Sequence, residues 1–386
     1  LRQLLQRGRS EEEEQEQQAE DRQQGTTITT TIPPALRRLL DPRWLDVVLP
    51  LALGIAVAAL SWVIDQVVAP DWINAAFGLL IGLGVGVCLW FAYSANRPIR
   101  FGLGIAALIV AGTLTAGSNT LHEDRSFFGV YKVIGDEGTE DAYHALIVGD
   151  TNHGAQLLGP KPPMPITYHH PTGPFGQLFD ALPDEAARSP IGVLGLGTGA
   201  MACYTQPGQQ MTFYEIDPLV EGIARDPNLF TYLRDCLGEF DVVLGDGRLS
   251  ISNAEDASYG MIVGEAFSSD AIPVHLMTRE AIDLYLSKLT SNGVLVFNVS
   301  NRHLALEPVL GNIARDKGLA CYGQFDGEIE GIPFKLASHF VVMAREEADL
   351  GSVPNDQRWQ PCETTPDSDN VWTDDFSNLL STFDWN

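Results

Sequence analysis

Residues 192–217 read GVLGLGTGAMACYTQPGQQMTFYEID: an apolar run, a turn built on Gly195, Gly197 and Gly199, and a second apolar run that ends in acids. Glycines let the backbone turn sharply out of a strand and let a ligand approach without meeting a Cβ atom. Glu215 follows the turn by about 20 residues, where a carboxylate can accept hydrogen bonds from both ribose hydroxyls. The stretch predicts a nucleoside-binding βαβ unit whose helix starts at the turn.

A second stretch of the same kind lies at residues 242–247, which read VVLGDG. We expect Asp246 to contact an adenine amino group beside the ribose that Glu215 binds. Taken alone, this stretch is also typical of an ordinary turn at the end of a strand. Together with the glycine turn and Glu215, it favours a nucleoside site.

The net charge of the chain is −26, and most of the acidic excess falls after residue 118. This charge disfavours nucleic-acid binding, because phosphate contacts need a basic surface. An acidic surface attracts cationic partners such as polyamines, although solubility or a salty environment explains the same charge. The eight histidines show no metal-type pair, and the five cysteines are scattered, so we expect no metal site and no disulfide framework.

The N-terminal third divides into a polar tail and an apolar region. Residues 1–31 are rich in Gln and Glu and predict a disordered tail. Within residues 32–118, the stretches at about 47–68, 72–94 and 100–117 are apolar and long enough to predict transmembrane helices.

The orientation of these helices stays open at the level of sequence. Arginines precede the first helix and follow the second, so the positive-inside rule places both of those ends in the cytoplasm. The third helix would then carry the rest of the chain outside, away from the cytosolic pool of adenosine-type cofactors. Three explanations of this conflict stay open. The third stretch does not cross the membrane, or further N-terminal helices reverse the orientation, or the domain does face away from the cytoplasm.

Beyond residue 118 the pattern changes to an α/β domain. Residues 119–165 predict a β-hairpin domain with strands at 127–134 and 143–148. Residues 166–350 alternate strands and helices, which predicts a parallel sheet covered on both faces. The strands are expected at 211–214, 260–264, 294–299 and 339–344, and the helices near 175–182, 278–289 and 306–317. Residues 351–386 form an acidic C-terminal segment.

The order of these motifs resembles the spermidine/spermine synthase family, and in particular its membrane-fused bacterial members. The resemblance is carried by Gln156, Tyr168-His169, the turn at 195–199, YEID at 214–217, GDG at 245–247, and the stretches 127–130, 151–156, 266–276 and 372–380. It implies a bacterial inner-membrane protein in which transmembrane helices precede a small β-domain and a methyltransferase-like Rossmann domain. The side of the membrane on which these domains lie stays open.

The resemblance also implies an activity. Aminopropyltransferases of this family move the propylamine group of decarboxylated S-adenosylmethionine to an amine by displacement at a carbon next to a sulfonium. This reaction needs positioning, a deprotonated amine, and carboxylates that hold the amine. The co-substrate would be decarboxylated S-adenosylmethionine, with no metal.

By the same resemblance, the predicted co-substrate contacts are Gln156, Gly195, Gly197, Thr198, Gly199, Glu215, Asp246 and Gly247. Catalysis or amine binding would fall to Tyr168, His169, Glu265 and Asp270. Glu265 lies where the family has its catalytic Asp, and Asp270 would add a second anionic contact. Simpler roles stay open: Glu265 as a capping or surface acid, Asp270 as a helix N-cap, and the Tyr-His pair as structural lining.

Four departures from the family pattern affect the amine half of the site. Thr198 stands where the family has an Asp that binds the amine of the co-substrate, which removes a charge-assisted contact of about 1.5 to 3 kcal/mol. Glu265 is one methylene longer than Asp, and the loop to Asp270 is longer. A late Tyr of the family is replaced near residues 332–334.

Three functions therefore remain open. The first is a membrane-bound aminopropyltransferase acting on a di- or polyamine. The second is a transferase of the same fold that uses intact S-adenosylmethionine, whose carboxylate the neutral Thr198 tolerates. The third is a non-catalytic subunit that binds a nucleoside or polyamine, or docks into a homo-oligomer or a membrane complex, for which the aromatic tail at 372–385 is a candidate.

Overall fold

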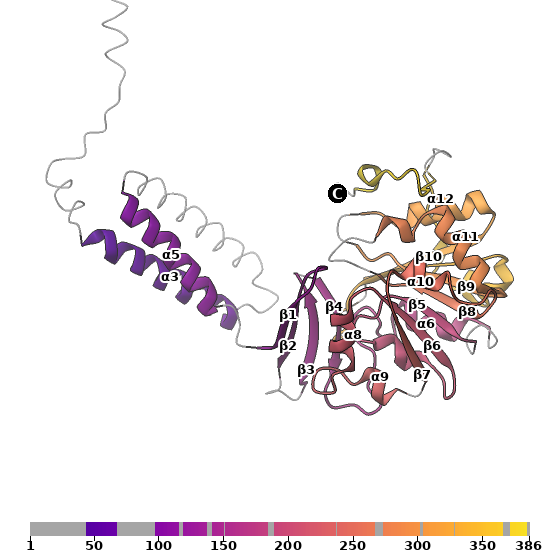
Figure 1. Cartoon of the computed structure of the whole chain (residues 1–386), viewed down its shortest axis with the longest axis horizontal. Helices are drawn as coiled ribbons and strands as arrows, with labels where there is room; N and C mark the ends of the chain where they lie inside the picture. Colours follow the sequence, from indigo (N-terminus) through magenta and orange to yellow (C-terminus); the bar gives the residue numbers. More distant parts are fainter. Residues whose placement is uncertain are drawn as a thin grey trace, which may run out of the picture. The chain divides into compact units, whose positions relative to one another are not determined.

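The computed structural model divides the chain into two compact units, Leu1–Ser118 and Asn119–Asn386. The described residues are 44–67, 97–115, 119–136, 141–149, 151–183, 189–236, 238–266, 273–301, 304–327, 329–365 and 371–383. The predicted tail at 1–31 and the apolar stretch at 72–94 lie outside these ranges. The two units are described separately (Figure 1).

The described part of the first unit is a pair of helices, α3 (Leu45–Val67) and α5 (Pro98–Thr115). They begin at the same end, because Asp46 in the first turn of α3 pairs with Arg100 in the first turn of α5, at 2.7 Å between the carboxylate and the guanidinium. Further along, Gly54 faces Ala107 so closely that a Cβ on Gly54 would lie 3.1 Å from the Ala107 Cβ. The helices therefore run parallel.

The two helices cover the first and third apolar stretches of the sequence. Judged over the described residues, neither combines the length and the apolar character that crossing a bilayer requires.

The second unit opens with a four-stranded antiparallel sheet in the order β1-β2-β3-β4. Its strands are β1 (Thr120–Arg125), β2 (Val130–Asp136), β3 (Tyr143–Val148) and β4 (Thr151–Leu157). The predicted hairpin corresponds to β2 and β3, so the prediction of a simple hairpin was wrong by two strands. β1 reads TLHEDR and is almost fully exposed, so it lacks the apolar alternation that reveals a strand.

The larger sheet has eight strands in the order β12-β10-β11-β9-β8-β5-β6-β7. They are β5 (Ile191–Leu194), β6 (Gln210–Glu215), β7 (Glu239–Leu244), β8 (Tyr259–Gly264), β9 (Leu289–Asn298), β10 (Ala320–Asp326), β11 (Ser338–Ala344) and β12 (Gln360–Pro361). β5 to β9 pair in parallel, whereas β11 is antiparallel to both β9 and β10. The predicted parallel sheet is therefore a mixed sheet, and its strand order is that of the methyltransferase-like Rossmann domain which the resemblance implied. The short link at 327–337 explains the difference, because a parallel return needs a longer crossover.

Helices cover both faces of this sheet, as predicted. Alternate residues of one strand enter two cores: Val193 of β5 packs with one set of helices, and Leu194 packs with the other. The first set is α6 (Pro174–Ala181), α8 (Pro218–Arg225) and α9 (Tyr232–Asp235); the second is α10 (Gly247–Ile251), α11 (Arg279–Lys288) and α12 (Glu307–Lys317). α11 and α12 lie side by side in Figure 1.

The glycine turn leads into a 3₁₀ helix, η2 (Ala200–Tyr204), and not into the predicted α-helix. The sequence offers a reason, because Pro207 and Gly208 follow at once. The residue before a proline avoids the helical region, so a longer helix would be interrupted here. The short connection returns the chain directly to β6.

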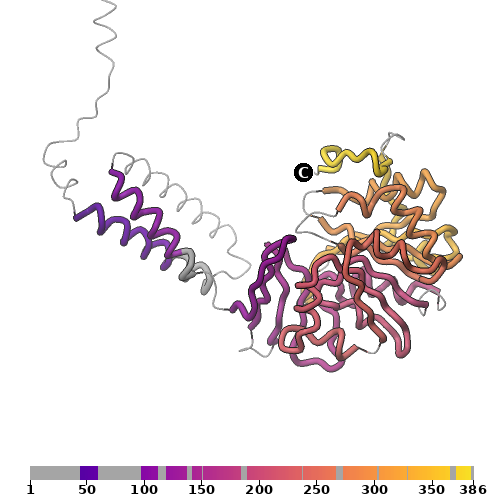
Figure 2. The backbone as a smooth tube through the Cα atoms, in the orientation of Figure 1, coloured from indigo at the N-terminus to yellow at the C-terminus, as the bar shows by residue number. Residues whose placement is uncertain are grey.

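The C-terminal segment packs against the domain; its trace is yellow in Figure 2. Trp372 is buried, and its carbonyl accepts a hydrogen bond from the backbone of Arg279 at the start of α11. The carboxylate of Asp374 accepts hydrogen bonds from both terminal nitrogens of Arg248, at 2.7 and 2.8 Å. The remaining short 3₁₀ helices are η3 (Val274–Leu276), η4 (Glu347–Leu350), η5 (Val353–Asn355) and η6 (Leu379–Thr382).

Four of the cysteines form two disulfides, Cys203–Cys236 and Cys321–Cys362, with Cα atoms 4.9 and 5.4 Å apart. The expectation of no disulfide framework was therefore wrong. Sequence separations of 33 and 41 residues carry no pairing signal, and only the fold brings these side chains together.

Candidate active site

The three turn glycines have positive φ angles of 104°, 55° and 81° at Gly195, Gly197 and Gly199. The first of them also needs space, because a Cβ on Gly195 would lie 2.7 Å from the backbone oxygen of Glu265. Glycine at this position therefore allows the turn to lie directly against the end of β8. The turn and the acid that follows β8 form one compact structure.

Glu215 holds this turn from the end of β6. Its carboxylate accepts hydrogen bonds from the backbone N–H of Leu196, at 3.0 Å, and of Asp217, at 2.9 Å. Burial raises the pKa of Glu215, partly offset by these backbone hydrogen bonds. The carboxylate is thus fixed beside the turn, where the sequence predicted a ribose contact.

Asp217 connects the turn region to the small sheet. It caps α8 by accepting from the Leu219 backbone N–H at 2.9 Å, and it also accepts a short hydrogen bond from the Ser126 hydroxyl. The same Ser126 oxygen accepts from the backbone N–H of Phe128, at 3.0 Å. This chain of bonds fixes the segment that presents Phe128 to the cavity described below.

Asp246 lies at the end of β7 and caps α10 by accepting from the Leu249 N–H at 2.9 Å. Its second oxygen is 2.9 Å from Nε2 of His275. The sequence predicted an adenine contact for Asp246 but did not single out His275. An adenine amino group bound here would meet an Asp–His pair.

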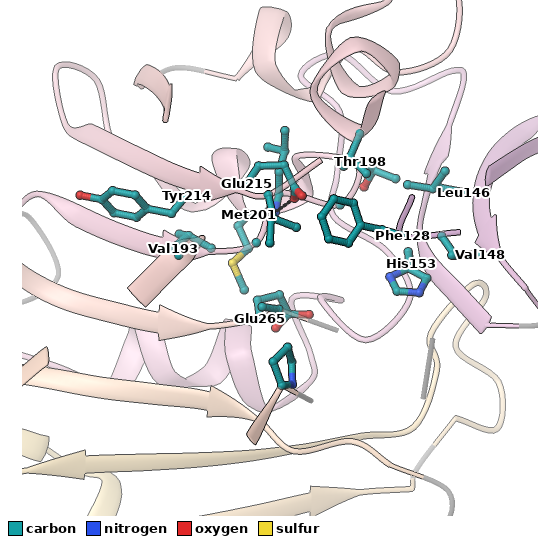
Figure 3. Close-up of a pocket in the computed structure, with 18 of the residues that line it drawn as sticks. Phe128, Leu146, Val148, His153, Val193, Thr198, Met201, Tyr214, Glu215 and Glu265 are labelled. Carbon is teal, nitrogen blue, oxygen red and sulfur yellow. Dashed lines mark hydrogen bonds between the residues drawn. The ribbon is translucent and has the colours of Figure 1, made fainter. Parts of the chain in front are cut away.

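A cavity of about 310 Å³ brings these groups together. Its lining includes Gly195, Gly197, Thr198, Glu215, Asp246, Gly247, Tyr168, His169 and Glu265 from the predicted set. Figure 3 shows Thr198 near the apolar side chains that the small sheet contributes, Phe128, Leu146 and Val148, while Glu265 lies apart from them. The small sheet and the Rossmann-like sheet therefore form one site.

Glu265 follows β8 and is held by Asn298 at the end of the neighbouring strand β9. The Asn298 side-chain amide donates to Oε1 of Glu265, at 2.9 Å. Nε2 of His169 is 3.4 Å from the same oxygen. Among the described residues, Oε2 of Glu265 and both ring nitrogens of His169 are buried without a hydrogen-bond partner.

Tyr168 lies beside His169, with ring centroids 4.5 Å apart. Burial, and next the negative charge of Glu265, raises the pKa of Tyr168 well above its ordinary value. Tyr168 is therefore a neutral hydroxyl at physiological pH, suited to hydrogen bonding and not to accepting a proton as a phenolate.

Two predicted residues that the structure describes, Gln156 and Gly199, do not line the cavity. Gln156 is buried and exchanges hydrogen bonds with Thr231, at 2.6 Å from its amide nitrogen and 2.7 Å to its amide oxygen, and it does not line the cavity. It links β4 to the start of α9. Asp270 lies in the segment 267–272, outside the described residues. Gly199 shapes the turn without lining the cavity.

The sequence did not single out Asn298, His275 or Phe128. Asn298 directly follows an apolar strand, which is a detectable signal, since the carboxyl ends of parallel strands are the usual place for a ligand in such sheets. His275 and Phe128 lie in stretches that carried the family resemblance, but no local pattern distinguished them. Among the described residues, no group of three or more potential metal ligands occurs.

Comparison with curated proteins finds a similarity over part of the chain. A segment of 128 residues is 34% identical to a polyamine aminopropyltransferase of Vibrio vulnificus, covering 32% of the present chain and 40% of that protein. The predicted resemblance to the spermidine/spermine synthase family is confirmed over this segment. The chain thus spans about two fifths of the length of the curated relative it matches. No protein-family model matches the chain.

Solved structures give weaker similarities. A probable spermidine synthase from Corynebacterium glutamicum is 18% identical with a TM-score of 0.45, covering 58% of this chain and 79% of that one. Spermidine synthase from Thermotoga maritima is 10% identical with a TM-score of 0.39, covering 69% and 85%.

Proposed function

We propose that the second unit is an aminopropyltransferase that moves a propylamine group from decarboxylated S-adenosylmethionine to a di- or polyamine. The main observation behind this proposal is that one cavity is lined by two kinds of group. Glu215 and Asp246 are suited to binding a nucleoside, and Glu265 is a separate buried carboxylate. The similarity to a polyamine aminopropyltransferase supports the same reaction class.

The two halves of the cavity have the chemistry that this reaction needs. Glu215 would accept hydrogen bonds from the ribose hydroxyls, and Asp246 would accept one from the adenine amino group. Glu265 would hold the cationic amine next to the carbon that is attacked. Much of the rate enhancement for such a displacement comes from positioning the two reactants. No metal is needed.

Intact S-adenosylmethionine is the second candidate co-substrate, and Thr198 favours it. Thr198 lines the cavity, is 2% exposed, and has a neutral side chain. A neutral hydroxyl tolerates the carboxylate that decarboxylation removes, whereas an Asp would repel it. The same fold would then transfer a different group.

Product analysis separates the two candidates. The full chain is incubated with decarboxylated S-adenosylmethionine and putrescine or spermidine, and separately with S-adenosylmethionine and the same amines. Release of 5′-methylthioadenosine supports aminopropyl transfer, and release of S-adenosylhomocysteine supports methyl transfer. If neither product forms and no nucleoside raises the melting temperature, both activities are excluded and a non-catalytic role remains.

We further propose that the protein is a bacterial inner-membrane protein whose second unit faces an oxidising compartment, so that decarboxylated S-adenosylmethionine would have to reach the site from the cytosol. Two disulfides in that unit support the compartment, because cytosolic thiols are normally kept reduced. The membrane location rests on the apolar sequence at about 72–94, since neither described helix of the first unit has the length and apolar character that crossing a bilayer requires. Assembly into a homo-oligomer and binding to partners in a membrane complex both stay predictions.

Labelling in intact cells tests the location. Glu330 is exposed, so a Glu330→Cys variant offers a thiol on the surface of the second unit. A membrane-impermeant maleimide should label it without permeabilisation. Labelling that appears only after permeabilisation would place the unit in the cytoplasm.

A further inference from the structure

The pair formed by His169 and Glu265 has more polar capacity than the described residues use. Both side chains line the cavity and are mostly buried, at 6% and 10% side-chain exposure. Nδ1 and Nε2 of His169 and Oε2 of Glu265 make no hydrogen bond with the described residues. Buried polar atoms without partners are rare and costly in folded proteins, and they commonly occur where a ligand supplies the partner.

A nitrogen bound in the cavity beside this pair would find, on each side chain, an acceptor that has no hydrogen-bond partner among the described residues. Nε2 of His169 is 3.4 Å from Oε1 of Glu265, which is longer than an ordinary N–H···O hydrogen bond. Asn298 already donates to Oε1, which fixes the carboxylate and leaves Oε2 available. A primary amine placed here would donate one N–H to Oε2 and present another hydrogen to Nε2.

The groups around His169 leave it as the suitable proton acceptor. Tyr168 is neutral because burial and Glu265 raise its pKa. Tyr204 donates its hydroxyl to the backbone carbonyl of His169, at 2.6 Å, and so holds the backbone and not the ring. Phe175 packs edge to face at 5.6 Å. Lys335 lowers the pKa of the neighbouring His170, after the larger effect of burial. The one charge in contact with the His169 ring among the described residues is therefore the carboxylate of Glu265.

We propose that His169 is the general base of the reaction and that Glu265 binds the amine and stabilises the imidazolium that forms. This inference rests on the proposed aminopropyl transfer. The ammonium substrate passes one proton to Nε2 of His169, and its freed lone pair forms the new C–N bond. The carbon–sulfur bond breaks, its electron pair neutralises the sulfonium, and the thioether nucleoside leaves. The product leaves as a secondary ammonium, and protonated His169 then returns its one proton to solvent.

An imidazole suits this role better than a carboxylate alone. The ammonium group of the substrate has a pKa near that of lysine, about 10.4. A carboxylate, whose conjugate acid has an ordinary pKa of about 4, is a weak acceptor for its proton. An imidazole titrates close to neutral pH, where a general base is most effective. The adjacent carboxylate compensates the positive charge that the ring acquires.

The pH dependence of turnover tests the proposal in the full-length protein. His169→Asn removes the basic nitrogen and keeps a polar side chain. We expect kcat at neutral pH to fall by about 10²- to 10⁴-fold, the usual contribution of general base catalysis. The residual rate should rise tenfold per pH unit toward the amine pKa, because solvent must then remove the proton. For His169→Ala, added imidazole should restore part of kcat.

His170→Asn is the matched control. His170 is also buried, but its ring bonds Thr172 and does not line the cavity. This variant should keep the wild-type pH profile. Retention of the melting-temperature shift with 5′-methylthioadenosine shows that each variant is folded and binds the nucleoside.

The outcomes separate the two proposals. Wild-type turnover together with an unchanged pH profile in His169→Asn would overturn the role of His169 and leave the aminopropyl transfer standing. Absence of 5′-methylthioadenosine from the wild type at every pH would overturn the transfer itself, and the role of His169 with it.

Discussion

Gly195 should be the glycine of the nucleoside turn at which substitution by alanine destabilises the protein most. Alanine variants of Gly195 and of two glycines outside the turn test the reason. The φ of Gly195, +104°, lies where side chains are strained, at a cost of about 1 to 3 kcal/mol. A Cβ there would also lie 2.7 Å from the backbone oxygen of Glu265, and a backbone atom cannot rotate away. Crowding of this kind typically adds about 1 to 3 kcal/mol.

Alanine also restricts the unfolded chain, which returns about 0.4 to 1 kcal/mol of stability. Gly195→Ala should therefore lower the free energy of unfolding by about 1 to 5.6 kcal/mol. The clash pushes on Glu265, whose carboxylate is the proposed contact of the amine. A displacement approaching 1 Å is enough to reduce turnover about 100-fold.

Two other glycines separate strain from crowding. Gly208 has a φ of +76° but nothing within 4 Å of its Cβ position, so Gly208→Ala should cost only about 1 kcal/mol. Gly222 lies in α8 with ordinary φ and open space, so Gly222→Ala should stabilise by up to about 1 kcal/mol. Urea unfolding measures all three. If Gly195→Ala costs no more than Gly208→Ala, the argument from crowding is refuted.

Further predictions concern the ribose contact, one disulfide and the C-terminal segment. Glu215→Gln should weaken nucleoside binding by about 10- to 150-fold in calorimetry, since an amide makes weaker bonds to hydroxyls; unchanged affinity would remove Glu215 from the site. Replacing Cys203 and Cys236 together by Ser should lower the free energy of unfolding by about 3.7 kcal/mol through loss of a 33-residue cross-link, and a value near zero would contradict the pairing. Hydrogen bonds from Arg248 and Thr278 lower the pKa of Asp374 to about 2, below its ordinary value of 3.8. The contact therefore stabilises the fold fully at a pH above 3.8, and this stabilisation is lost as the pH falls toward 2. Hydrogen exchange around Trp372 should increase over that window, and Asp374→Asn should show the increase already at neutral pH.

Local sequence patterns were sufficient for the central strands and for the nucleoside half of the site. β6 was predicted at 211–214 and is observed at Gln210–Glu215, because an apolar run between turn residues is a direct signal of a buried strand. The glycine turn and Glu215 were predicted from spacing alone, since both belong to one short βαβ unit. Local signals fail where a strand is exposed: β1 reads TLHEDR and reveals itself only through pairing with β2.

The amine half of the site depends on contacts that no single segment encodes. Glu265 was predicted from its position after a strand and from the family resemblance. Its contacts with Asn298 and His169 bring together residues 33 and 96 positions away in the chain. Such contacts follow from the order of strands in the sheet, in which β8 and β9 are neighbours.

The disulfide between Cys321 and Cys362 shows how strand pairing creates chemistry that spacing does not indicate. β12 is only Gln360–Pro361, too short to be predicted from sequence, yet it pairs with Tyr322 and Gly323 of β10. This pairing places Cys362 beside Cys321, and the backbone of Cys362 donates to the Cys321 carbonyl at 3.0 Å. The cross-link therefore joins the C-terminal segment to the edge of the main sheet. Farther along the same segment, Asp374 accepts hydrogen bonds from Arg248, and Arg248 also donates to the carbonyl of His275, whose ring contacts Asp246. The C-terminal segment therefore contacts the domain both at the sheet edge and beside the cavity.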